Sequence, residues 1–142
     1  MEGESGSIQT PRYPLDYPVD KVCSWIIRLQ PGEKVVLSFE TFSLEDHLFC
    51  QYDYVIIRDG SSSKSPMVGK FCGEDRPATI TSTSNHLWID FRSDSSTTAQ
   101  GFKAVWKTEK IEISSTSTKS TTKPSPTPTT AKGLILITFY ML

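Results

Sequence analysis

The sequence predicts an all-β fold, a sandwich or barrel built from short strands. Between residues 6 and 108, apolar and polar residues alternate over short runs, and no window keeps a helical period for long. Segments rich in Gly, Pro, Ser, Asn and Asp separate these runs, as is typical of antiparallel sheets. A length of 142 residues allows one domain with a single sizeable core, together with an appendage.

Five runs carry apolar residues at every second position, and such residues share one face of a strand. In chain order, these inward positions are Trp25, Ile27 and Leu29 in SWIIRL; Val35, Leu37 and Phe39 in KVVLSFETF; Val55 and Ile57 in YDYVIIR; Leu87, Ile89 and Phe91 in HLWIDFR; and Phe102, Ala104 and Trp106 in GFKAVW. Asp90 and Arg92 take alternate positions and are predicted to face solvent. Trp88 is also outward, but both faces of a central strand can be covered, so we favour packing over an exposed contact.

Polar segments between these runs are predicted to be turns, because Gly, Pro, Asn, Asp and Ser each favour turn conformations. They are SLEDHLF, DGSSSKSP, GEDRP, STSN and SDSSTTAQG. The segment DGSSSKSP lacks the GxxxxGK[ST] spacing of a phosphate-binding loop and has no helix after it. We interpret it as a hairpin connection.

Composition argues against two classes of function. The formal net charge is −1, with no long run of either sign, whereas nucleic-acid binding needs a clustered excess of Lys and Arg. The chain has no GxSxG or HExxH motif, no CxxC pair, and two histidines far apart, His47 and His86. We therefore predict no nucleic-acid partner, no enzymatic activity and no structural zinc site.

The cysteines and the N-terminus point to different compartments. Cys50 and Cys72 flank a strand and a turn-rich segment, so a disulfide between them would close a loop and contribute about 3 kcal/mol. Such a bond implies an oxidising compartment. The opening MEGESGSIQT has neither the basic nor the apolar region of a signal peptide. Either the chain is a fragment or truncated isoform, or its cysteines are reduced; we favour the first.

The C-terminal part differs in composition from the rest of the chain. Residues 114–130 are almost wholly Ser, Thr, Pro and Lys, which predicts a disordered segment, either an O-glycosylated stalk or an ordinary linker. The apolar run 134–142 is about half the roughly 20 residues that cross a bilayer, so this chain is predicted to have no membrane span. That run could be a truncated span or a spliced tail, and if exposed it would favour aggregation. The predicted parts are 1–4, an N-terminal remnant; 5–108, the folded domain; 109–132, the linker or stalk; and 133–142, a short apolar tail.

Asp53 is the residue that suggests a function. It shares a strand face with Val55 and Ile57, and a carboxylate taken out of water needs a cation, an ion-pair partner or several hydrogen-bond donors. Glu45 lies in the connection leading to this strand, and Asp94 just follows another strand. If those strands are neighbours, the three acids meet at one end, where Ca²⁺ would relieve their repulsion because it prefers several hard oxygen ligands. On spacing alone, solvated loop acids remain the alternative.

Several motifs, taken in order, resemble those of a CUB domain. They are GSIQTPRYPLDYP, CSWIIRL, FETFSLEDHLFCQYDYVIIRDG, GKFCG, LWIDFRSDSSTTAQGF and AVW. The resemblance runs from about residue 5 to 108 and so covers essentially the whole predicted folded part. It implies a two-sheet antiparallel, jelly-roll-like β-sandwich, in agreement with the strand pattern, followed by the disordered tail.

The resemblance also implies a calcium site. In calcium-binding members of the family, three acidic side chains hold the ion at one end of the sandwich. The matching residues are Glu45, Asp53 and Asp94, with a backbone carbonyl near Ser96 and water completing the coordination. Tyr17 matches a tyrosine that supports these acids by hydrogen bonding.

The function implied by the resemblance is binding outside the cell, because CUB domains bind proteins or, more rarely, glycans and have no catalytic machinery. The expected partner is an extracellular protein that presents Lys or Arg to the calcium-ordered acids, and the expected parent is secreted or a receptor ectodomain. His47 and Ser96 are candidates for the adjoining surface, although His47 is better explained as a solvated loop residue. Two alternatives are a non-catalytic arm of an extracellular protease and a passive spacer on a stalk.

Cys23 departs from the usual family pattern. The family commonly has a first disulfide that joins a cysteine at the start of the domain to the position of Cys23. No cysteine precedes Cys23 in this sequence. The resemblance therefore implies that Cys23 is unpaired and supports a truncated N-terminus.

Overall fold

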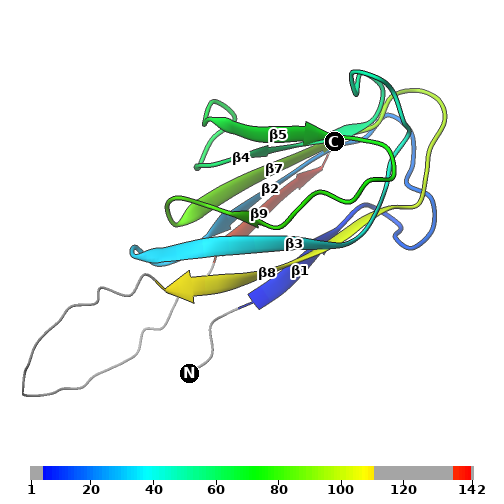
Figure 1. Cartoon of the computed structure of the whole chain (residues 1–142). Helices are drawn as coiled ribbons and strands as arrows, with labels where there is room; N and C mark the ends of the chain where they lie inside the picture. Colours follow the sequence, from blue (N-terminus) through cyan, green and yellow to red (C-terminus); the bar gives the residue numbers. More distant parts are fainter. Residues whose placement is uncertain (1–4, 111–135, 142) are drawn as a thin grey trace, which may run out of the picture.

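The computed structural model describes residues 5–110 and 136–141, which form two antiparallel sheets packed face to face (Figure 1). The strands are β1 (Ser5–Gln9), β2 (Val22–Arg28), β3 (Glu33–Ser43), β4 (Tyr54–Arg58), β5 (Met67–Phe71), β6 (Ile80–Thr81), β7 (His86–Arg92), β8 (Gly101–Lys110) and β9 (Leu136–Met141). One sheet has the order β1-β8-β3-β6, and the other has the order β5-β4-β7-β2-β9. Since the described residues contain no helix, the all-β sandwich prediction is confirmed.

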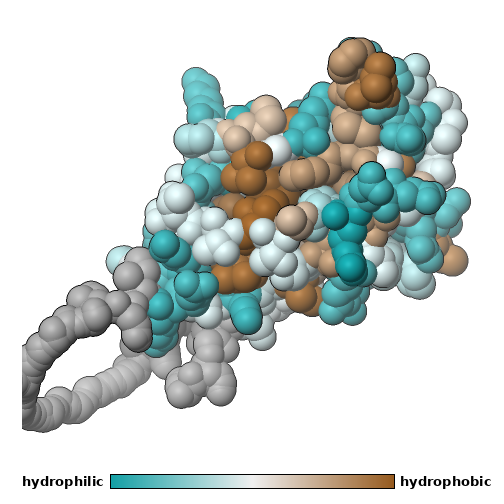
Figure 2. Space-filling view, viewed as in Figure 1, coloured by the Kyte–Doolittle hydropathy of each residue, from teal (hydrophilic) through white to brown (hydrophobic). Residues whose placement is uncertain are grey.

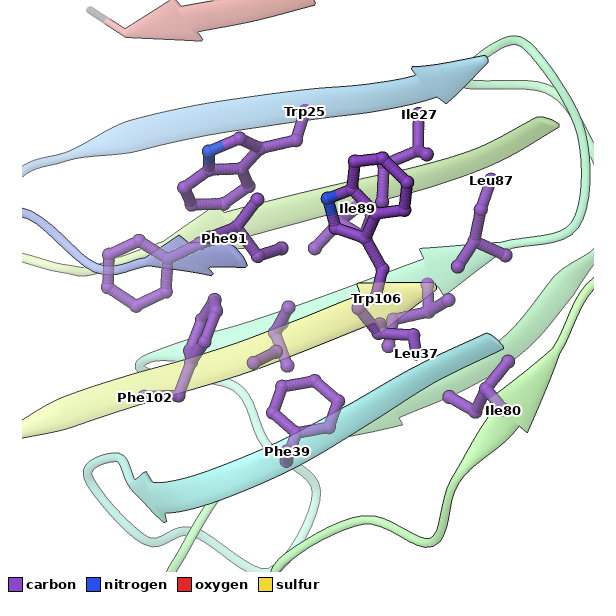
Figure 3. Packing of buried hydrophobic residues seen from close by; sticks show 14 of the residues in the cluster. Trp25, Ile27, Leu37, Phe39, Ile80, Leu87, Ile89, Phe91, Phe102 and Trp106 are labelled. Atoms are coloured by element: carbon purple, nitrogen blue, oxygen red, sulfur yellow. The ribbon is translucent and has the colours of Figure 1, made fainter. Parts of the chain in front are cut away.

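The core lies between the sheets and is built from the predicted inward residues (Figure 3). All of them are buried, and most are fully so. Aromatic rings fill the centre: Phe102 on β8 meets Trp25 of β2 edge-on at 5.9 Å between ring centroids, and it meets Phe91 of β7 at 6.0 Å. Edge-on ring pairs of this kind add to the stability gained from burial. The apolar residues that alternate in the sequence therefore point inward from both sheets and form the core between them.

A glycine permits close packing at the edge of the four-stranded sheet. Gly6 on β1 lies opposite Trp106 on β8. A Cβ at residue 6 would lie 2.8 Å from the indole ring, which is too close for a non-bonded contact. The indole of Trp106 therefore takes the space that any side chain at residue 6 would need.

The apolar tail includes an edge strand. The sequence predicted an apolar segment without assigning it to a sheet, but β9 pairs antiparallel with β2, from Arg28 opposite Leu136 to Cys23 opposite Met141. The predicted linker overlaps the end of β8 at residues 109 and 110, and the rest of it, like the predicted remnant 1–4, lies outside the described residues. In the part of the chain that is described, no helix is long and apolar enough to cross a membrane.

Candidate metal centre

Three connections meet at one end of the sandwich, namely residues 10–21, 44–53 and 93–100 (Figure 1). Backbone hydrogen bonds join the first connection to the third. The Tyr17 N–H donates to the Ala99 carbonyl at 3.0 Å, and the Asp20 N–H donates to the Asp94 carbonyl at 2.8 Å. The second connection joins them through side chains, because it carries Glu45 and Asp53.

The three predicted acids converge at this end. One carboxylate oxygen from each of Glu45, Asp53 and Asp94 lies within 4.8 Å of the other two. Asp53 is fully buried, as are Val55 and Ile57 after it, and this confirms that the three residues share the core face. Glu45 and Asp94 are half-buried above it. We call these three residues the acidic cluster.

Tyr17 links two members of the acidic cluster. Its hydroxyl donates a hydrogen bond of 2.6 Å to Asp53 Oδ2 and accepts one of 3.1 Å from the Glu45 N–H. The other oxygen of Asp53, Oδ1, accepts the Asp94 N–H at 2.8 Å. These contacts fix the buried carboxylate and bring the backbones of Glu45 and Asp94 toward it, so they match the supporting role expected for Tyr17.

Burial and mutual repulsion govern the electrostatics of the acidic cluster. Burial raises the pKa of Glu45, and the charges of Asp53 and Asp94 raise it further, while His47 lowers it. Burial also raises the pKa of Asp53, although the hydrogen bonds from Tyr17 and from the Asp94 N–H act in the opposite direction. Burial and the bond to Asp53 raise the pKa of Tyr17, which keeps its hydroxyl proton at neutral pH. The folded chain therefore disfavours three charges here unless a cation is present.

The donors present suit a calcium ion. Glu45 Oε1 is buried and has no hydrogen-bond partner, which leaves one carboxylate oxygen free for a cation. The described residues contain two salt bridges, Lys103–Glu40 and Lys110–Glu33, and neither involves the acidic cluster. Clustered carboxylate oxygens without a Lys or Arg partner form the hard donor set that Ca²⁺ prefers, and its other ligands would be carbonyls and water.

Ser96 and His47 lie beside the acidic cluster with different contacts. Ser96 is exposed, and its N–H donates to Asp94 Oδ1 at 3.2 Å. His47 Nδ1 accepts the Phe49 N–H at 3.2 Å, and the His47 ring lies 4.3 Å from the Tyr52 ring. This imidazole therefore supports its own loop through Nδ1. Its predicted contact with a ligand and the predicted carbonyl ligand near Ser96 stay predictions.

The cysteines are arranged as expected. Cys50 and Cys72 form a disulfide, which ties the loop before β4 to the end of β5. Cys23 is free and buried. Burial raises the pKa of its thiol to about 11, so the reactive thiolate is scarce at neutral pH.

Two features of this end were not identified from the sequence. Ser93 is buried, accepts the Lys21 N–H at 3.0 Å and donates to the Pro18 carbonyl at 2.8 Å, thereby holding the first connection against the third. Its position could have been found, because it continues the inward alternation of Leu87, Ile89 and Phe91. The other feature is the exposed pair Leu48 and Phe49 on the loop after β3, whose tip carries apolar residues in Figure 2.

Most of the described part of the chain matches one family. The family model described as the CUB domain matches residues 1–106. The chain belongs to the CUB domain family. Among curated relatives, it is 48% identical over 114 residues to Bone morphogenetic protein 1 of Xenopus laevis, covering 80% of this chain and 16% of that protein. It is 42% identical over 109 residues to Cubilin of Canis lupus familiaris, covering 77% of this chain and 3% of that protein.

Solved CUB structures share the fold. The crystal structure of the MASP-1 CUB2 domain bound to Ca²⁺ has a TM-score of 0.65 and 40% identity, covering 72% of this chain and 90% of that one. The full extracellular region of zebrafish Gpr126/Adgrg6 has a TM-score of 0.69 and 35% identity, covering 75% of this chain and 14% of that one. CUB domains serve as generally non-catalytic protein-interaction modules in extracellular proteases and receptors. The chain spans less than a fifth of the length of the two curated relatives named above.

Proposed function

We propose that this CUB domain binds one Ca²⁺ through Glu45, Asp53 and Asp94 and uses the ordered loops to bind an extracellular protein. The observation that carries the proposal is the convergence of three carboxylate oxygens within 4.8 Å around a fully buried Asp53. The calcium-bound MASP-1 CUB2 structure, similar in fold and 40% identical, supports the choice of ion. A backbone carbonyl near Ser96 and water would complete the coordination.

A cationic side chain of the partner would complete the binding surface. A carboxylate held by the ion is fixed in position, and its second oxygen can still accept a charge-assisted hydrogen bond from Lys or Arg. Asp46, Glu74 and Asp75 are exposed beside Glu45 and line the same depression, so the surroundings also favour a cation. His47 and Ser96 flank this surface.

Thermal unfolding with calcium or a chelator tests the proposal. With a dissociation constant on the order of 10⁻⁴ to 10⁻³ M, typical of extracellular modules, 10 mM Ca²⁺ stabilises the folded chain by about 1.5–3 kcal/mol. That free energy corresponds to a rise in melting temperature of roughly 5–20 °C for a domain of this size. Asp53→Asn removes one charge from the cluster and is expected to abolish the rise. Identical unfolding curves for the wild type in calcium and in chelator would refute the proposal.

The relatives favour a second use for the same domain. Because Bone morphogenetic protein 1 is a protease that contains similar sequence over 16% of its length, the chain could serve as a non-catalytic arm of an extracellular protease. This role still requires a binding surface and therefore predicts the calcium effect. A passive spacer predicts no calcium effect, so the unfolding experiment separates the spacer from both binding functions.

A further inference from the structure

The outer face of the five-stranded sheet carries a row of cations. Alternate residues on β2, β4 and β7 are buried in the core, and Phe71 of β5 packs against it, so the residues between them face outward. Four of these outward residues are basic, and they come from four neighbouring strands: Arg28 on β2, Arg58 on β4, Lys70 on β5 and Arg92 on β7. Asp90 is the one acid on the described strands of this sheet. We call these four residues the basic face.

No described acid forms a salt bridge with the basic face. Both described salt bridges, Lys103–Glu40 and Lys110–Glu33, lie on the other sheet. Asp90 instead accepts a hydrogen bond of 2.6 Å from the Ser24 hydroxyl. The described strands of this sheet therefore carry four Lys or Arg residues against one acid, and none of the four cations has a salt-bridge partner among the described residues.

Two of the cations are held in position by neutral partners. The Lys70 ammonium lies 4.2 Å from the centre of the Tyr54 ring, and Arg58 Nη1 donates to the Ser65 carbonyl at 3.0 Å. These contacts preserve the positive charge while restricting each side chain. A restricted cation loses less conformational entropy when it binds an anion.

The strand register spreads the cations along a track. Arg92 lies opposite Tyr54, Arg58 opposite Trp88, and Arg28 is in the next pair along the strands. With strands about 4.8 Å apart and about 6.8 Å per two residues, successive Cα atoms of the basic face are about 8–12 Å apart. The whole track is then roughly 20 Å long. A single small anion could reach one or two of these cations, whereas a linear polyanion could contact all four.

We propose that the basic face binds a linear sulfated polysaccharide. Trp88 is half-buried at the centre of the track and Tyr54 lies at its edge, so aromatic surface is available for the apolar faces of sugar rings between the sulfate contacts. The relatives are extracellular or secreted, and sulfated polysaccharides are polyanions of that compartment. The proposal does not depend on the calcium site, since none of its residues belongs to the acidic cluster.

Isothermal titration of the full chain with a size-defined heparin oligosaccharide tests this proposal. The triple variant Arg28→Gln, Lys70→Gln, Arg92→Gln should weaken binding at least tenfold and reduce its salt dependence, because fewer counterions are released. The matched variant Lys34→Gln, Lys107→Gln, Lys110→Gln removes three charges from the four-stranded sheet and should change the affinity less than twofold. Unchanged melting temperatures for both variants would establish that the loss is not caused by unfolding.

Other polyanions and the chelator define the remaining outcomes. Chemically desulfated heparin should bind at least tenfold more weakly, and binding of the native oligosaccharide should survive chelation of calcium. Equal losses in the two triple variants would show an effect of net charge alone and overturn the proposal. Single-stranded DNA of matched charge binding as tightly as heparin would overturn it too, because the face would then lack selectivity for sulfated sugar.

Discussion

Two aspartates flank strand β4 and have opposite surroundings. Asp53 precedes the strand, is fully buried and lies within reach of Glu45 and Asp94. Asp59 follows the strand at the other end of the sandwich, and its oxygens accept the Thr83 N–H at 3.0 Å and the Thr83 hydroxyl at 2.9 Å. Both residues are loop acids next to the same strand, yet among the described residues only Asp53 belongs to a group of three converging acids.

The difference shows what distinguishes a metal site from an ordinary loop acid. The two neutral donors on Thr83 satisfy Asp59, so it needs no cation. Asp53 also has two donors, from Tyr17 and from the Asp94 backbone, but the two other acids add charge that these donors do not offset. Convergence of carboxylates from three loops, rather than a buried acid alone, therefore distinguishes the proposed calcium site.

Loss of the disulfide is expected to have the largest effect. Cys50 and Cys72 are 22 residues apart, and closing a loop of that length stabilises the folded chain by about 3 kcal/mol. Cys50→Ser with Cys72→Ser should lower the free energy of unfolding by about that amount and weaken calcium binding, because Cys50 anchors the loop that carries Glu45. Urea denaturation with calcium and with chelator measures both effects. Unchanged calcium stabilisation in this variant would show that the loop is positioned without the bond.

Tyr17→Phe should have the next largest effect. It removes the hydroxyl that donates to Asp53 and accepts from the Glu45 N–H, at an expected cost of about 1–3 kcal/mol in calcium. Tyr13→Phe is the matched control, because its hydroxyl bonds with Thr41 at an exposed position and its loss should cost less than about 0.5 kcal/mol. Chemical denaturation of both variants in calcium gives the comparison. Equal losses would contradict the special role of Tyr17.

The exchange Asp59→Asn should have a small effect that does not depend on calcium. The amide oxygen can still accept the Thr83 N–H, so the free energy of unfolding is expected to change by less than about 1 kcal/mol. The calcium-induced rise in melting temperature should equal that of the wild type, in contrast to Asp53→Asn. Differential scanning calorimetry of both variants checks the contrast. A reduced calcium-induced rise in the melting temperature of Asp59→Asn would contradict the assignment of calcium binding to the Asp53 end of β4 alone.

The pH dependence of the calcium-free chain should show the smallest effect. Folding raises the pKa values of Glu45 and Asp53, so between the unfolded and folded pKa values the folded chain binds more protons than the unfolded chain. Stability contributed by this cluster is then greatest below about pH 4 and is lost as the pH rises through the raised values. Unfolding in chelator from pH 4 to 7 should show this loss, and Asp53→Asn should reduce it. A wild-type profile identical to that of the variant would contradict the assignment.

The strands recognised from the sequence are the ones inside the sheets. The alternation of apolar residues identified β2, β3, β4, β7 and β8, whereas β1, β5, β6 and β9 lie outside those runs. The second group includes both edges of each sheet. Edge strands such as β5 bury little of their surface, so selection for alternating apolar residues is weak there. The run that contains β9 is almost wholly apolar, so the sequence does not show which of its residues would face the core.

The acids of the candidate site could be predicted from the sequence, but the hydrogen bonds that hold its loops together could not. The period of the strand placed Asp53 on the core face, and the positions of Glu45 and Asp94 beside neighbouring strands suggested the cluster. The resemblance strengthened that set and supplied Tyr17. The hydrogen bonds that hold these loops together join backbones distant in sequence, such as Asp20 to Asp94, and no local pattern reveals them. The basic face was likewise hidden, because its four cations come from four strands and lie on one sheet face only through the pairing of β5, β4, β7 and β2.

A crystal structure of the chain grown with calcium chloride would show whether the acidic cluster holds the ion. We expect one calcium ion at the end of the sandwich, with an oxygen from each of Glu45, Asp53 and Asp94 at about 2.3–2.6 Å. We expect no ion at Asp59, where Thr83 supplies both hydrogen bonds. Three carboxylates turned apart and solvated by water in the presence of millimolar calcium would refute the calcium site.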